Sequence, residues 1–193
     1  MSDFAKMSEW QSLDAESGQV IRAAGYAVIL ASAAAALLPA GEFENGPIIV
    51  GSLMLFVGLL EILGNLLRAS GRRAGTAAGL ASVAAGALIF AQPVSSFLTT
   101  VYVFIGWLLV RALLLGISAI ENVGPIRRLT SMAAVVDLIL AGVVWTGLTA
   151  STLVIALFGP TKPIIADFAW VVTISFVGSG LLLVKLASEQ SST

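Results

Sequence analysis

Three charged residues interrupt otherwise apolar stretches, and they have the clearest potential for chemistry in this sequence. Glu61 and Asp137 supply carboxylates, and Arg111 supplies a guanidinium group. Two carboxylates inside a membrane can form a proton or solute site, with one of them protonated at rest. The same three groups can instead form a buried ion pair that fixes helix register and the choice of partner. Lipid or partner binding is a third use of such residues.

We expect the structural ion pair rather than a transport site. Transporters usually show broken helices and further polar residues along the substrate path, and neither pattern is evident in this sequence. Deep charges of this kind cost on the order of 3 kcal/mol each on insertion scales, so they must face the inside of a helix bundle.

The sequence offers little for catalysis beyond these residues. It contains neither cysteine nor histidine, which excludes disulfides, thiolate chemistry, iron–sulfur clusters and the common zinc sites. It has no Walker loop and no nucleophile elbow. Its net charge of −1 provides no basic field for nucleic acid. We therefore expect no enzymatic activity, no cofactor, no metal site and no nucleic-acid partner.

The elements that position the charged residues are expected to be membrane-spanning helices. The 193 residues are 58% hydrophobic and only 11% charged, whereas soluble domains are about half apolar and about a quarter charged. Apolar runs of about 20 residues can cross a bilayer as helices. The sequence thus predicts an all-α fold, a bundle of six transmembrane helices built from three helical-hairpin repeats. The predicted spans are residues 20–38, 47–69, 74–91, 96–120, 129–147 and 164–187.

The end of the fifth span is the hardest boundary to place. A single helix over residues 129–158 would be about 45 Å long, against an apolar bilayer core of roughly 30 Å. We therefore predict that the spanning part stops near Gly147 and that residues 153–159 form a short segment on the outer surface. Strong tilt of one long helix is the alternative.

The basic residues predict the orientation. With the N-terminus inside, all lysines and arginines that flank the spans except Lys162 lie on the cytoplasmic side. This places the protein in a bacterial inner membrane with both termini in the cytoplasm. Glu61, Arg111 and Asp137 each lie about eight residues, or roughly 12 Å, from the cytoplasmic end of their helices. We expect them to meet at one level as an intramembrane ionic cluster.

Two further patterns concern helix faces. Glu61, Asn65 and Arg68 recur at positions i, i+4 and i+7 and form a polar stripe, which either conducts protons or, as we favour, faces the headgroups at a helix end. Small residues at intervals of three or four allow helices to pack closely. The predicted packing residues are Gly75, Gly79, Ser82 and Gly86, with a further ladder of Ala23, Ala27, Ala31 and Ala35 in the first span and Gly178 and Gly180 in the sixth.

The spans repeat with a period of about 50 residues, and the repeated strings resemble a known family. These strings are "GSLMLFVGLLEILGNLLRASGRRAG", "GLASVAAGALIFAQP" and "FIGWLLVRALLLGISAI". They resemble the HdeD-like family of small bacterial membrane proteins, which is linked to acid resistance, and the likeness covers roughly residues 20–187. It defines no functional residues. The acidic tail and the insertion at residues 150–163 depart from the usual family pattern.

The two ends of the chain are expected to be cytoplasmic tails. Residues 1–19 are acidic, and Phe4, Met7, Trp10 and Leu13 recur every three residues. This spacing is typical of a short helix at the membrane surface, and a mobile tail is the alternative. Residues 188–193 form the C-terminal tail.

Three functions follow as hypotheses. The first is a non-enzymatic, HdeD-like protein that acts through helix contacts as an accessory or scaffold subunit, with lipid and other membrane subunits, or further copies of itself, as partners. The second, implied by the resemblance, is a protein of acid or stress resistance, in which carboxylates would have to sense pH because histidine is absent. The third is a small proton or solute transporter that uses Glu61 and Asp137.

Overall fold

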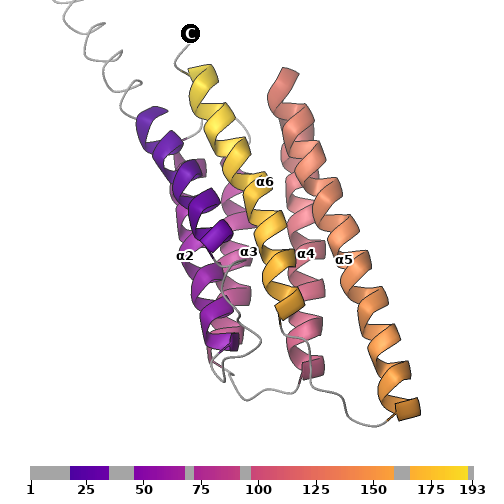
Figure 1. Ribbon diagram of the computed structural model, residues 1–193. Coiled ribbons are helices and arrows are strands. Elements are labelled where there is room, and N and C mark those ends of the chain that lie inside the picture. Colours follow the sequence, from indigo (N-terminus) through magenta and orange to yellow (C-terminus); the bar gives the residue numbers. More distant parts are fainter. Residues whose placement is uncertain (1–17, 35–45, 68–71, 92–96, 159–165, 191–193) are drawn as a thin grey trace, which may run out of the picture.

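The described residues form an up-and-down bundle of helices (Figure 1). In the computed structural model these residues are 18–34, 46–67, 72–91, 97–158 and 166–190. Helix is the regular secondary structure throughout this part of the chain, which confirms the predicted all-α bundle. A first helix covers Gly18–Ala34. It is followed by α2 (Gly46–Leu66), α3 (Arg72–Ala91), α4 (Phe97–Glu121), α5 (Gly124–Phe158) and α6 (Ala166–Gln190).

Length and composition make this a multi-pass membrane protein. Each of the helices α2 to α6 contains an apolar stretch long enough to cross a bilayer. The described part of the first helix is shorter, and the predicted span 20–38 continues beyond it. Large apolar side chains such as Leu30, Leu113 and Ile139 lie on the outside of the bundle, where lipid is the solvent that suits them.

Helices that follow one another in the sequence pack side by side, and α6 returns to contact α2. The ring of helices from α2 to α6 is thereby closed, and side chains fill its interior. The largest buried apolar side chains of this interior include Met54, Phe104, Leu108, Trp107 and Phe176. A charged side chain pointing inward from any of these helices therefore reaches the other helices rather than lipid.

A two-residue connection joins α4 to α5. The side-chain amide of Asn122 donates a hydrogen bond to the Ser118 carbonyl at 2.6 Å, which satisfies one of the free carbonyls at the end of α4. Gly124 then adopts a φ of +61°, a left-handed conformation that strains any residue with a Cβ. Pro125 follows at the start of α5, where a proline fits a helix. The short turn aligns α4 and α5 as an antiparallel hairpin.

Glycines set the close approach of α2 and α3. A Cβ at Gly86 would lie 2.8 Å from the Gly51 carbonyl oxygen, and one at Gly58 would lie 3.0 Å from the Gly79 carbonyl oxygen. The two backbones touch at two levels, seven residues apart on each helix. Gly79 and Gly86, expected to be packing residues, lie at these contacts, and Gly75 is buried on the same helix.

The first helix packs on α6 through another pair of glycines. A Cβ at Gly180 would lie 2.8 Å from the Gly25 carbonyl oxygen, whereas Gly178 has open space around it. Of the predicted alanine ladder, Ala31 packs against the core and Ala27 is half-buried, but Ala23 is exposed. The most buried positions of this helix include Ala24, Gly25 and Val28. The packing face is thus rotated by one residue, since it is fixed by where Gly180 allows contact; Ala35 lies outside the described residues.

The fifth helix corrects a second prediction. It runs without a break from Gly124 to Phe158, so the expected separate segment from residue 153 is wrong, and the helix continues past Gly147. No proline interrupts it after Pro125, and the Thr146 and Thr149 hydroxyls donate to carbonyls of their own helix. Residues 153–158 at its C-terminal end are apolar as well. Strong tilt, the alternative, is what would fit one helix of this length to an apolar core of roughly 30 Å.

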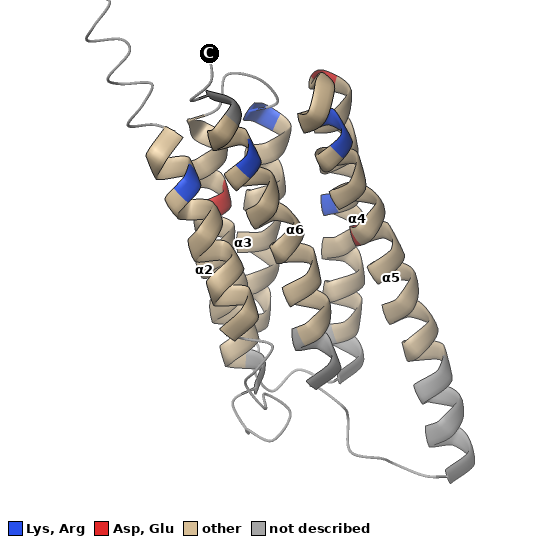
Figure 2. Cartoon of the chain, turned by 45° about the horizontal axis from the view of Figure 1, so that its top comes forward, with Lys and Arg blue, Asp and Glu red and all other residues tan. Residues whose placement is uncertain are grey.

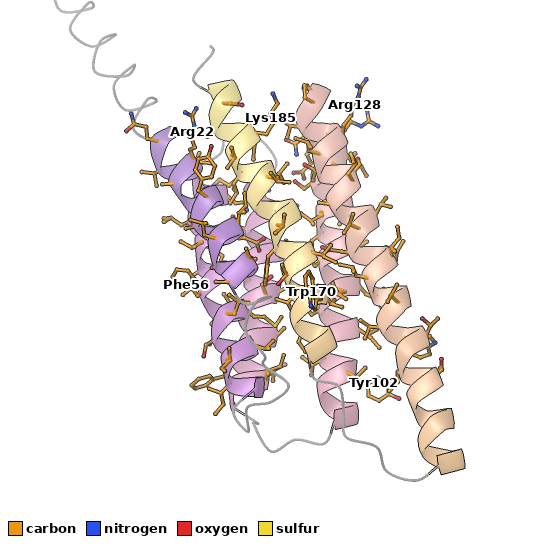
Figure 3. The ribbon with its side chains drawn as sticks, in the orientation of Figure 1. Arg22, Phe56, Tyr102, Arg128, Trp170 and Lys185 are labelled. Atoms are coloured by element: carbon orange, nitrogen blue, oxygen red, sulfur yellow. The ribbon has the colours of Figure 1, made fainter. Side chains whose placement is uncertain are left out.

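The positively charged residues of the described helices gather at one end of the bundle, apart from Arg111 (Figure 2). We call this the basic end; it contains Arg22, Arg72, Arg73, Arg127, Arg128 and Lys185. Figure 3 shows Arg22, Lys185 and Arg128 there, and Tyr102 toward the opposite end. The terminal segments 1–17 and 191–193 and the loop residues 159–163 lie outside the described residues, as does Arg68.

Candidate functional site

The structure brings together Glu61 of α2, Arg111 of α4 and Asp137 of α5. Their exposed fractions are 4%, 0% and 1%, although each stands in a helix that is otherwise apolar. A charge in contact with lipid is costly, so each helix turns its charged residue toward the centre of the ring. The three residues meet at one level of the bundle, where they form ion pairs.

Glu61 binds the end of the guanidinium group with both oxygens. Arg111 Nη1 donates to Glu61 Oε2 and Nη2 donates to Oε1, each at 2.7 Å. Two parallel, charge-assisted hydrogen bonds of this kind are the strongest arrangement of an arginine and a carboxylate. The pair links α4 to α2 across the ring.

Asp137 binds the side of the same guanidinium group. Arg111 Nε donates to Asp137 Oδ2 at 2.9 Å, and the Ser175 hydroxyl donates to Oδ1 at 2.6 Å. The carboxylate therefore bridges α4 and α6. In the described part of α5, Asp137 is the ionisable side chain that reaches the interior of the ring.

Two more hydroxyls complete the coordination of Arg111. Ser82 of α3 accepts from Nη1 at 2.9 Å, and Ser179 of α6 accepts from Nη2. Every N–H donor of the guanidinium group then has a partner. We name the set the Arg111 cluster; its members are Glu61, Ser82, Arg111, Asp137, Ser175 and Ser179. Through it, one side chain of α4 is bonded to α2, α3, α5 and α6.

Aromatic rings cover the cluster on the side away from the basic end. The Arg111 Cζ atom lies 5.7 Å from the centroid of the Trp107 ring and 5.0 Å from that of Phe176, within the range of cation–π attraction. The Trp107 indole N–H donates to the Ser82 hydroxyl at 3.1 Å. The rings thus shield the charges and also hold one of their partners in place.

A small cavity lies beside the cluster toward the basic end. Its lining includes Glu61, Asn65, Gly75 and Ser179, and its volume is about 10 Å³. This is close to the smallest space that holds one water molecule, and polar groups line it. Asn65, the second member of the predicted polar stripe, lines this cavity, and its amide also donates to the Glu61 carbonyl at 2.8 Å.

Sequence reasoning missed part of the site. Ser82 was expected only to pack, but it accepts hydrogen bonds from both Arg111 and Trp107. Ser175 and Ser179 were not singled out, although their spacing of four residues places both hydroxyls on one face of α6. A count of depth from the basic end would have placed that face beside Asp137.

The contacts of the Arg111 cluster stabilise the arrangement of the helices. Removing one partner of a buried ion pair leaves an uncompensated charge and costs about 3–5 kcal/mol. Here the loss of Arg111 would leave two buried acids without the guanidinium group that both of them bind. Among the described residues, no group of three or more acids, histidines or cysteines could hold a metal ion. Comparisons with family models, curated proteins and solved structures give no match.

Proposed function

We propose that this protein is a non-enzymatic, HdeD-like protein of a bacterial inner membrane, acting through helix contacts as an accessory or scaffold subunit of a larger membrane assembly. The observation that carries the proposal is the complete coordination of Arg111 by side chains from four other helices. Because all N–H donors of this guanidinium group bind other helices, they stabilise the bundle, and none is left to bind a substrate.

The interior supports a fixed frame over a transport path. A transported solute needs polar groups that exchange partners along the route, whereas the hydroxyls and carboxylates of the Arg111 cluster bind one another. The cavity beside Glu61 has a volume of only about 10 Å³. It therefore accommodates at most about one water molecule.

The outer surface supports contact with other helices. Gly106 of α4 and Gly142 and Gly147 of α5 are exposed, and a Cβ at any of them would meet nothing within 4 Å. Small residues on a lipid-facing surface allow another helix to approach closely. Because α4 and α5 are neighbours, these glycines lie on adjacent helices of one side of the bundle.

Native purification tests the proposal. The full chain, extracted with its surrounding lipid, is expected to migrate with a defined partner or with further copies of itself. Gly142→Leu is expected to release that partner without changing the thermal unfolding midpoint, because the added side chain has open space in the isolated chain. The matched control is Leu113→Phe, an exposed position of α4 that carries no glycine.

Two outcomes would contradict the proposal. One is recovery of the wild-type protein only as a monomer from native membranes. The other is a proton or solute flux in liposomes that exceeds the flux of empty vesicles and disappears in Glu61→Gln. That second result would favour the small transporter instead.

A further inference from the structure

The charges of the Arg111 cluster do not balance. Two carboxylates face one guanidinium group, and all three are buried. The other charged residues whose side chains the structure describes, such as Arg127, Arg128 and Glu121, are exposed near the ends of their helices at the basic end. With both acids ionised, the cluster would carry one excess negative charge inside the membrane, which is a strongly unfavourable state.

The hydrogen bonds distinguish the two carboxyl groups. Glu61 uses both oxygens to accept from Nη1 and Nη2 at 2.7 Å, so neither oxygen has room for a proton without losing an arginine contact. Asp137 accepts from Arg111 only through Oδ2. Its Oδ1 faces the Ser175 hydroxyl at 2.6 Å. Because a hydroxyl can accept as well as donate, a proton on Oδ1 keeps this hydrogen bond in the reverse direction.

Ser175 can release its own hydrogen for that reversal. Serines in this bundle commonly donate to the carbonyl one turn earlier in their helix, as Ser82 donates to Ala78 at 3.2 Å and Ser32 to Val28 at 2.7 Å. If Ser175 donates in the same way, the proton on Asp137 and the serine hydroxyl both have acceptors. The contacts around Asp137 therefore suit a neutral carboxylic acid as well as they suit a carboxylate, whereas those around Glu61 suit only the carboxylate.

The neighbouring helices contribute no further titratable group to this place. From α4 Asp137 faces Arg111, and from α2 it faces Glu61 beyond the guanidinium. The described residues of α3 and α6 present only the hydroxyls of Ser82, Ser175 and Ser179 there. A cavity with room for about one water molecule, lined by Asn65 and Gly75, adjoins Glu61 and Ser179 on the side toward the basic end.

We infer that the Arg111 cluster is a binding site for one exchangeable proton, which Asp137 holds at neutral pH while Glu61 is the ionised partner of Arg111. The inference goes beyond the proposed scaffold role and does not depend on any partner. It makes the cluster electrically neutral inside the membrane, and it gives the two acids different states despite their shared cation.

Infrared spectroscopy of the full chain in lipid nanodiscs tests this directly. At neutral pH we expect the C=O stretch of a protonated carboxyl group, shifted when the sample is exchanged into D₂O. The band should be lost in Asp137→Asn and unchanged in the control Glu121→Gln, whose carboxyl group is exposed. Absence of the band in the wild-type protein overturns the inference, and so does its persistence in Asp137→Asn.

Unfolding measurements give a second, independent readout. Asparagine has the shape of a protonated aspartic acid, so Asp137→Asn should keep the unfolding midpoint of the wild type. Glu61→Gln should lower it, because Arg111 loses its ionised partner. Equal losses in both variants would show that Asp137 is ionised. A midpoint that rises specifically with Na⁺ or K⁺ in the wild type would assign the balancing charge to a cation, and would also overturn the inference.

Discussion

The hairpin of α2 and α3 and the hairpin of α4 and α5 are held together in different ways. In the first, backbones meet at Gly51 with Gly86 and at Gly58 with Gly79. In the second, side chains make the contact, with the Arg111–Asp137 ion pair at its centre and apolar residues such as Leu108 and Leu140 around it. The glycines of the second hairpin, Gly106 and Gly142, face outward.

The difference shows that a glycine in a membrane helix does not by itself indicate a contact with a neighbouring helix of the same chain. Lipid removes the hydrophobic drive for helices to associate, which leaves close backbone packing and buried polar contacts as the main attractions. The first hairpin uses the former and the second uses the latter. A glycine whose helix already has a polar attachment is free to face the outside.

Arg111→Ala should have the largest effect, because it removes the polar attachment of the second hairpin. Ionised Glu61 loses its cation and Asp137 loses a hydrogen-bond donor, so the free energy of unfolding should fall by about 3–5 kcal/mol. Unfolding of the purified protein by SDS, followed by circular dichroism, measures this. Arg111→Lys keeps the charge and should recover only part of the loss, since lysine cannot bind Glu61 with two parallel bonds. A loss for Arg111→Ala below about 1 kcal/mol would leave the cluster no structural role.

Gly86→Val tests the glycine contacts of the first hairpin. A Cβ at Gly86 would lie 2.8 Å from both the Gly51 oxygen and the Leu55 nitrogen, so the backbones must separate. We expect a loss of about 3 kcal/mol, the upper end for overpacking. The same unfolding assay serves. Equal stability of this variant and the wild type would mean that α2 and α3 are not in backbone contact.

Ser82→Ala should have a smaller effect and connects the two hairpins. It removes the acceptor of one Arg111 hydrogen bond and of the Trp107 indole hydrogen bond. Buried donors left without partners cost about 1–2 kcal/mol. The change in Trp107 fluorescence would report the local loss separately from global unfolding. Ser52→Ala, an exposed serine that bonds only to its own helix, is the control.

Gly142→Ala should have the smallest effect on the isolated chain. A Cβ has open space there, and alanine is the better helix former, so the stability should change by less than about 0.5 kcal/mol. The comparison with Gly86→Val sharpens the distinction between inner and outer glycines. A large loss at Gly142 would show that the outward face is already packed against something within the chain.

Hydropathy alone predicted the helical bundle, and the depth of three charges predicted which residues share a level. The lipid bilayer determines both results, because the apolar length of a helix must match the bilayer thickness and a charged side chain must avoid lipid. The partners of the charges were not predictable in the same way. A serine such as Ser175 or Ser179 can face lipid at little energetic cost, because its hydroxyl can donate to a carbonyl of its own helix. Its presence in a span therefore does not predict which way its side chain points.

The face of the first helix and the end of α5 illustrate two further limits. Alanine occurs on several faces of the first helix, and only the position of Gly180 on α6 selects Gly25 as the contact. That information lies more than 150 residues away along the chain. For α5, the apolar residues continue to Phe158. Bilayer thickness alone argued for an earlier end of the span, and it does not determine where a helix stops.

The length of α5 has a consequence for the side of the membrane opposite the basic end. Its 35 residues extend about 52 Å, and even at a steep inclination of about 40° they would rise about 40 Å. This matches the full thickness of a bilayer with its headgroups, about 40–45 Å. The helix α5 is therefore long enough to reach from one headgroup layer to the other, with apolar residues at its C-terminal end.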